Sequence, residues 1–144
     1  MGGGADFPVC ADLDSGDREI MLHTEFYHQC ALIDWWRFNC RKFGVPERLL
    51  HHSPQEGIRS KITGHHLKRI GMRPGFPDLM LYVQRGHYGG MAIEMKAENG
   101  RATKEQNEFL EDLKAQGYAT YICRSWEDAR DKIVDYLSGK PLDE

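Results

Sequence analysis

Two short stretches decide the fold: Gly75-Phe76-Pro77-Asp78, which opens an apolar run, and Ile93-Glu94-Met95-Lys96, which lies inside a second one. In a β-strand, successive side chains point to opposite faces. Glu94 and Lys96 should therefore share one face of the second strand, while Ile93 and Met95 share the other. The pattern predicts one face that carries chemistry and one that packs.

A glycine-rich connection, residues 84–90, joins the two runs and is typical of a β-hairpin. A hairpin would bring Asp78 near Glu94. Clustered carboxylates repel each other unless a cation lies between them, and hard oxygen ligands suit Mg²⁺ or Mn²⁺. A lysine such as Lys96 could then hold a water or neutralise charge on a phosphate. Taken alone, however, a Glu-x-Lys triplet is more typical of a surface ion pair on a half-exposed sheet.

With its flanks included, the chain resembles the VRR-Nuc family of the PD-(D/E)XK nuclease superfamily, in particular its stand-alone bacterial and phage members. The resemblance rests on residues 71–78 (GMRPGFPD), 93–96 (IEMK), 103–106 (TKEQ) and 25–29 (EFYHQ), and covers roughly residues 22–138. It implies a restriction-endonuclease-like α/β core, with a mixed β-sheet flanked by helices.

The resemblance also implies a metal site for Mg²⁺ or Mn²⁺. The carboxylates of Asp78 and Glu94 would be ligands, together with the main-chain carbonyl of Met95. Glu25, in the first turn of a predicted helix, would approach the metal directly or through water. A carboxylate at a helix N-terminus is also favourable without any metal, so that alternative stays open.

The remaining catalytic residues implied by the resemblance are Lys96 and Gln106. Lys96 would position the attacking water and stabilise the charge that develops on the phosphate. Gln106 would bond near the lysine or the water. This agrees with its place one helical turn before Phe109 and Leu110, on the predicted buried stripe, where a polar group needs a partner.

Basic residues are concentrated in one segment of a chain whose net charge is −3. Residues 37–77 contain nine Lys/Arg against two Glu, a net of +7, and the rest of the chain carries −10. Cations on this segment could contact a DNA backbone next to an acidic metal site. The alternative is a solvated helix face. The candidate DNA-binding residues are Arg73, Lys68, His52, Arg59 and Lys61.

The function implied by the resemblance is metal-dependent hydrolysis of DNA phosphodiesters, leaving 5′-phosphate and 3′-hydroxyl ends. Stand-alone members are similar to homodimeric resolvases of branched DNA, so the expected substrate is a four-way (Holliday) junction. Two symmetric cuts need two sites, which a homodimer supplies. The alternatives are a nuclease for flaps, nicks or single strands, and a DNA-binding module with an inactive site. Residues 52–57 (HSPQEG) depart from the usual family turn, His-x-Pro-Asn-Gly-Gly, at Gln55 and Glu56.

The 144 residues predict a single domain over residues 19–144, preceded by a mobile leader over residues 1–18. A signal peptide and a long apolar run are both missing from the sequence, so we expect a cytoplasmic protein. Cys10, Cys30, Cys40 and Cys123 are widely spaced, which favours free thiols over disulfides. A zinc-stabilised adaptor using cysteines and histidines is a further alternative.

The predicted elements follow the order αβαββαβα. They are helices over 24–43, 58–70, 104–116 and 125–137, and strands over 49–52, 78–83, 91–95 and 118–123. A helix crosses over between the last two strands, which predicts that they run parallel and that the sheet is mixed.

Overall fold

The computed structural model describes residues 14, 16, 24–53 and 61–142. Its elements are α2 (Glu25–Asn39), the 3₁₀ helices η2 (Cys40–Phe43) and η3 (Glu47–Leu49), β1 (Leu50–His52), α3 (Lys61–Arg69), β2 (Leu79–Leu81), β3 (Met91–Met95), α4 (Lys104–Ala115), β4 (Ala119–Cys123) and α5 (Trp126–Leu137). Apart from the two 3₁₀ helices, this is the predicted order αβαββαβα. Nearly all of the predicted leader lies outside the described residues, as do Gln55 and Glu56.

The strands form one mixed sheet in the order β1-β2-β3-β4. β2 and β3 are antiparallel, with Leu79 opposite Ile93, so the predicted hairpin is confirmed. β3 and β4 are parallel, with Met95 opposite Cys123, and α4 makes the crossover between them. The carboxyl ends of β3 and β4 therefore meet at the same edge of the sheet.

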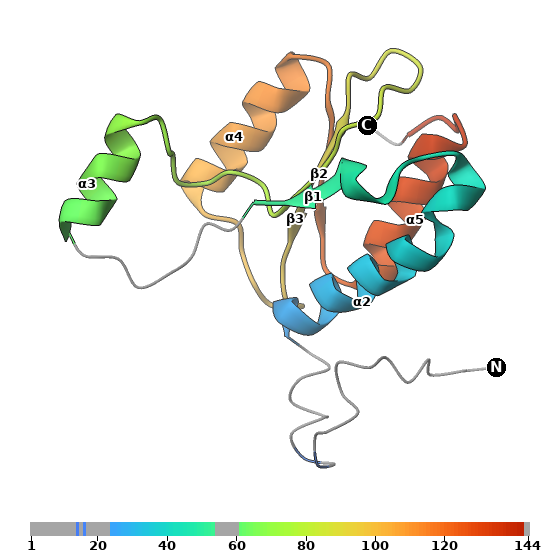
Figure 1. Ribbon diagram of the computed structural model, residues 1–144, viewed down its shortest axis with the longest axis horizontal. Coiled ribbons are helices and arrows are strands. Elements are labelled where there is room, and N and C mark those ends of the chain that lie inside the picture. The colour runs from blue at the N-terminus through green and yellow to red at the C-terminus, as the bar shows by residue number, and fades with distance from the viewer. Residues whose placement is uncertain (1–13, 15, 17–23, 54–60, 143–144) are drawn as a thin grey trace.

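Helices cover both faces of the sheet, with α2 and α5 on one side and α4 on the other (Figure 1). The larger core lies between the sheet and the pair α2 and α5, where Trp36, Leu32 and Ile133 are completely buried. Burial of such large apolar side chains is the main stabilising term of a domain this size. The smaller core joins Met80 and Ala92 to Leu110 of α4.

β3 alternates between these two cores as its sequence predicts. Met91, Ile93 and Met95 belong to the larger core, whereas Ala92 packs in the smaller core on the α4 side. Glu94 follows Ala92 by two residues and so faces α4 as well. Because both faces are covered, all five residues of β3 are buried. The face of β3 that carries Glu94 therefore lies in the interior of the protein.

The first helix is shorter than predicted. α2 ends at Asn39, and the remaining predicted turn tightens into η2 before Gly44 ends it at φ 68°, a left-handed conformation that glycine adopts without strain. Thr24 caps the start through its Oγ1, which accepts the Tyr27 N–H. Of the two consecutive tryptophans, Trp36 is buried and Trp35 lies partly buried against Phe43.

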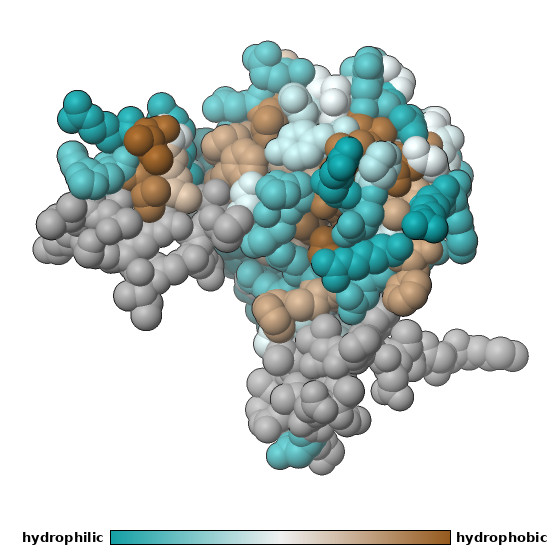
Figure 2. Space-filling model, viewed as in Figure 1, coloured by the Kyte–Doolittle hydropathy of each residue, from teal (hydrophilic) through white to brown (hydrophobic). Residues whose placement is uncertain are grey.

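α3 lies apart from the sheet at one end of the molecule (Figure 1). Residues 65, 66, 68 and 69 are exposed, and Ile70, just beyond the end of α3, is 80% exposed. Figure 2 shows apolar side chains at this end of the molecule, among hydrophilic neighbours.

β2 is also shorter than predicted, because ladder pairing stops at Leu81. The chain then forms a tight turn in which Arg85 and Tyr88 bond to each other through their main chains. In the described part of the chain, no helix has the length and apolar character needed to cross a membrane. Cys40 and Cys123 are free thiols.

Candidate active site at the end of the hairpin

The hairpin register brings the two motif carboxylates together. The Met95 N–H donates to Asp78 Oδ2 over 2.8 Å, and the Asp78 N–H donates to Glu94 Oε2 over 3.3 Å. Each carboxylate is therefore bonded to the strand that carries the other. These reciprocal bonds fix the positions of both carboxylates to the backbone of the sheet.

Two further side chains converge on the other oxygen of Glu94. Lys96 Nζ lies 3.2 Å from Glu94 Oε1, and Gln106 Nε2 donates to the same atom over 2.9 Å. Glu94 is 1% exposed and Lys96 is 9% exposed. Burial makes each of these contacts stronger than a surface contact, because less water screens it. We refer to Asp78, Glu94, Lys96 and Gln106 as the carboxylate cluster.

Glu94 is hard to ionise in this surrounding. Burial is the largest cause, and the neighbouring Asp78 carboxylate adds to it; together they raise the pKa of Glu94 to about 7 although Lys96 acts in the opposite direction. Desolvation and like charge both disfavour the anion. A divalent cation between the two carboxylates would remove both penalties. The electrostatics of the site therefore suit a bound cation.

The donor set fits a hard metal ion such as Mg²⁺ or Mn²⁺. Carboxylate oxygens of Asp78 and Glu94 lie together, and a main-chain oxygen is added by Met95. Because the N–H and C=O of a strand residue emerge on the same side, the Met95 carbonyl is directed toward Asp78, like its N–H. Among the described residues, no three His, Cys, Asp or Glu side chains form a metal-binding group. Waters would have to complete the coordination, as is usual for Mg²⁺.

Glu25 lies beside this cluster, at the start of α2. Its Oε1 accepts the Ala97 N–H over 3.3 Å, one residue beyond Lys96. The structure thus brings Glu25 to the end of the motif strand from a segment more than fifty residues away in sequence. Its bond is to the main chain, so direct ligation of a metal by Glu25 stays a prediction.

Gly75 explains why the motif contains a glycine before Asp78. Its φ is 86°, and a Cβ there would lie 2.7 Å from the main-chain carbonyl of Glu105 and 2.9 Å from Gln106 N. The motif loop therefore packs directly against the first turn of α4. That turn is further fixed by a capping box, in which Thr103 Oγ1 accepts the Gln106 N–H and Gln106 Oε1 accepts the Thr103 N–H. The side chain of Gln106 is held at both ends.

The candidate DNA-binding residues fall in different places. His52 ends β1, and its Nδ1 lies 2.7 Å from the Asp78 main-chain oxygen, so it borders the cluster. Lys68 is exposed on α3, and Arg73 is exposed in the loop that leads to Asp78. Lys61 is the first residue of α3. Arg59 lies outside the described residues.

Arg124, which follows β4, is a residue that the sequence patterns did not single out. Its guanidinium bonds to main-chain carbonyls just after Lys96. The signal that could have found it is topological. Residues that follow two neighbouring parallel strands emerge at the same edge of the sheet, which is where sites of α/β proteins form.

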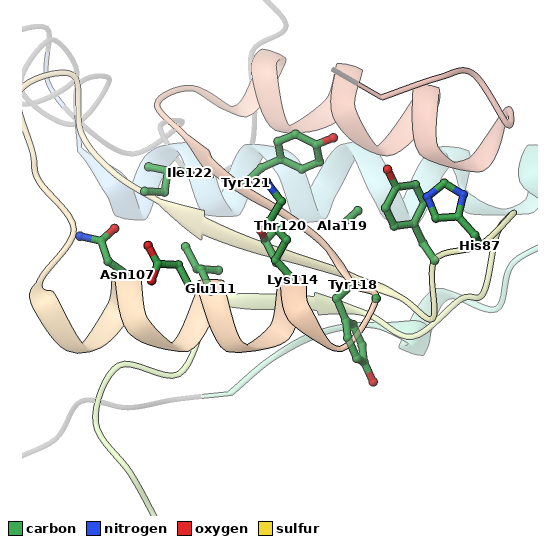
Figure 3. A pocket seen from close by; sticks show the side chains of 12 residues that line it. His87, Asn107, Glu111, Lys114, Tyr118, Ala119, Thr120, Tyr121 and Ile122 are labelled. Atoms are coloured by element: carbon green, nitrogen blue, oxygen red, sulfur yellow. The ribbon is translucent and has the colours of Figure 1, made fainter. Parts of the chain in front are cut away.

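A groove of about 530 Å³ lies along the open edge of the sheet, between α4 and β4 (Figure 3). Asn107, Glu111 and Lys114 line it from the helix, and Thr120 and Ile122 line it from the strand. None of the carboxylate cluster lines this groove. The carboxylate cluster and the groove are therefore two separate sites on the protein.

Comparisons with known proteins agree with this geometry. The VRR-NUC domain family model matches residues 14–127. A solved structure titled "VRR_NUC domain protein" is 29% identical, with a TM-score of 0.68, over 83% of this chain and 93% of that chain. No curated protein matches at a significant level. Because the family model covers most of the chain, including every member of the carboxylate cluster, this chain belongs to the VRR-NUC domain family.

Proposed function

We propose that this protein, a nuclease-type domain by its family, is an Mg²⁺- or Mn²⁺-dependent endonuclease that hydrolyses DNA phosphodiesters. The observation that carries the proposal is the buried Glu94. Two of its bonds come from Lys96 and Gln106, and its charge is opposed by burial and by Asp78. In this arrangement the ionised form of Glu94 is destabilised, and a bound cation would stabilise it. Strongly perturbed carboxylates of this kind are typical of functional sites.

Asp78, Glu94 and the Met95 carbonyl would hold the metal. When bound, Mg²⁺ or Mn²⁺ supplies Lewis-acid polarisation of the scissile phosphate. Gln106 contributes by orienting Glu94, since its amide is bonded to the carboxylate at one end and to the Thr103 N–H at the other. Preorganised groups of this kind avoid the cost of rearrangement during the reaction.

Lys96 would hold the attacking water and stabilise the charge that develops on the phosphate. An ammonium group has three N–H donors. One of them faces Glu94 Oε1 at 3.2 Å, which leaves two for a water and a phosphate oxygen. The family resemblance adds the expected outcome, 5′-phosphate and 3′-hydroxyl ends. Glu25 would assist from the end of the strand, through a water or directly.

The proposed substrate is branched DNA, with a four-way junction as the first choice, and the proposed active form is a homodimer. Support comes from the resemblance to stand-alone members of the family and from symmetry, because paired cuts across a junction need two sites. Arg73, Lys68, His52, Lys61 and Arg59 would contact phosphates. Contacts to phosphates position a protein on DNA without reading its sequence, which suits an enzyme that selects DNA by shape.

The decisive experiment compares wild type with Asp78→Ala on three labelled substrates: a four-way junction, a linear duplex and a single strand, each with Mg²⁺ or Mn²⁺. Paired symmetric nicks in the junction, lost in the variant, are the expected result. Cutting of the other substrates alone would retain the nuclease and reject the resolvase.

A binding module with an inactive site is the competing function. It predicts that the protein binds DNA yet cuts none of the three substrates, and that calorimetry detects no Mn²⁺ uptake. Uptake by wild type that disappears in Asp78→Ala would exclude it.

A further inference from the structure

Three main-chain carbonyls converge on one guanidinium nitrogen beside the carboxylate cluster. Nη1 of Arg124 donates to the oxygens of Ala97 at 3.1 Å, Glu98 at 3.3 Å and Gly100 at a short distance. Nη1 carries only two hydrogens, so at least one of them is shared between two carbonyls. Carbonyl oxygens are the negative ends of peptide dipoles. A fixed cation is a favourable partner for all three.

These carbonyls belong to the turn that directly follows Lys96. The Gly100 N–H donates to the Ala97 oxygen over 2.9 Å, which closes the turn. Just before it, the Lys96 N–H donates to the oxygen of Cys123 over 2.9 Å, and Cys123 immediately precedes Arg124. The end of β4 therefore holds the end of β3 twice, once through its main chain and once through the arginine side chain.

Ala97 is fixed on both of its polar groups. Its N–H donates to Glu25 Oε1 and its carbonyl accepts from Arg124 Nη1. The two side chains come from the start of α2 and from the end of β4, so they tie the turn to elements on either side of it. Lys96 is the residue before Ala97, and the direction of its side chain depends on this backbone.

We propose that Arg124 is a positioning residue: by holding the carbonyls of residues 97, 98 and 100, it fixes the backbone on which Lys96 is presented to Glu94 and the substrate. The role in turnover rests on the proposed nuclease function, whereas the role in holding the turn does not. Arginine suits the task because its planar fork keeps its donors in fixed directions, which the single ammonium of lysine does not.

A direct phosphate contact is the competing role for Arg124, since its guanidinium has further N–H groups and the residue is exposed. The two roles predict different kinetics. Loss of a phosphate contact weakens DNA binding and raises KM, whereas loss of positioning lowers kcat with little change in KM.

The first test measures amide hydrogen exchange in wild type, Arg124→Ala and Arg101→Ala. Arg101 is the matched control, because it is an exposed arginine of the same loop and forms no ion pair within the described residues. We expect the Lys96 and Ala97 amides to exchange at least tenfold faster in Arg124→Ala than in wild type, and at the wild-type rate in Arg101→Ala. Unchanged exchange in that variant would overturn the proposal, whether or not the protein cuts DNA.

The second test measures cleavage of the preferred DNA by the same three proteins. In Arg124→Ala we expect kcat to fall more than tenfold while KM stays within about twofold of the wild-type value. Added guanidinium at millimolar concentration, far below concentrations that unfold proteins, should restore part of the lost kcat. Methylammonium at the same concentration should restore little. A rise in KM at constant kcat would assign Arg124 to phosphate binding and reject the positioning role in turnover. If wild type cuts nothing, the nuclease proposal fails and the exchange result alone decides whether Arg124 holds the turn.

Discussion

The carboxyl end of β3 and the outlying helix α3 carry charges in opposite ways. At β3, Glu94 and Lys96 are buried and each is bonded to named partners. On α3, Lys68 and Arg69 are exposed, and neither forms an ion pair among the described residues. One region fixes its charges, and the other leaves them to solvent.

The difference follows from what each region is proposed to do. Stabilising charge on one phosphate needs groups held at fixed distances before the reaction begins. Attracting a DNA backbone needs only positive charge near the surface, because counterion release depends little on geometry. Substitutions at the end of β3 should therefore alter turnover strongly, and substitutions on α3 should alter binding weakly.

The largest effect is expected for Lys96→Ala. Turnover should fall by more than about a hundredfold, since the variant removes transition-state stabilisation from an interior site, while junction binding changes only a few-fold. Single-turnover cleavage and a gel-shift titration measure the two quantities. Lys114→Ala, which removes an exposed lysine of α4, should cleave like wild type. If Lys96→Ala retained turnover, Lys96 would have no role in the mechanism, and the proposed contrast between the two regions would not hold.

Gly75→Ala should come next. The new methyl group would clash with the backbone of Glu105 and Gln106, and a φ of 86° is strained for alanine. We therefore expect the free energy of unfolding to fall by about 2–4 kcal/mol and the position of Gln106 to change. Gly71→Ala is a matched control, because that glycine also has positive φ but open space around it. Equal losses in the two variants, measured by denaturant unfolding, would show that backbone strain alone matters.

The buried Glu94 should make the metal-free protein less stable as the pH rises. Its pKa is 4.5 in the unfolded reference and about 7 in the folded protein, so between these values the folded state binds more protons. For this group, stability is highest below pH 4.5, falls through the window and levels off above pH 7. The difference of about 2.5 pKa units corresponds to a loss of roughly 3 kcal/mol.

Thermal unfolding in EDTA at several pH values measures that loss. Glu94→Gln should flatten this part of the profile, whereas Glu111→Gln, at an exposed position, should leave it unchanged. If Mn²⁺ fails to restore stability at pH 8 in wild type, the carboxylates do not share a cation.

The smallest effects are expected on the basic segment. Lys68→Ala or Arg73→Ala should weaken DNA binding only a few-fold, lower the slope of log K against log salt by about one unit, and leave turnover of bound DNA unchanged. Fluorescence anisotropy at several salt concentrations measures the slope. A large loss of turnover in either variant would mean that this segment also has fixed catalytic geometry, and the comparison would no longer hold.

Much of the fold could be predicted from local pattern. Alternation in residues 91–95 predicted which side chains face which layer, and the glycine-rich connection predicted the hairpin that joins Asp78 to Glu94. The capping box of Thr103 and Gln106 is equally local, because it spans only four consecutive residues. These features depend on neighbours in sequence, which a sequence displays directly.

Other features were out of reach of local pattern. Burial of Glu94 depends on α4 packing over the sheet, and the contact of Gly75 with Glu105 joins segments thirty residues apart. Helix ends were misplaced by a few residues, as at η2, since tertiary contacts decide whether the last turn is α or 3₁₀.

The sequence by itself determined the order of elements and the hairpin, since these follow from periodicity and turn chemistry, and the family resemblance of its motifs pointed to the four cluster residues. Only the tertiary structure decided that Glu94 is an interior carboxylate with a raised pKa, that Glu25 meets the end of β3, and that Arg124 holds the turn after Lys96. The physical reason is that burial and electrostatics depend on all neighbours in space. In this fold, those neighbours come from α2, α4 and the end of β4.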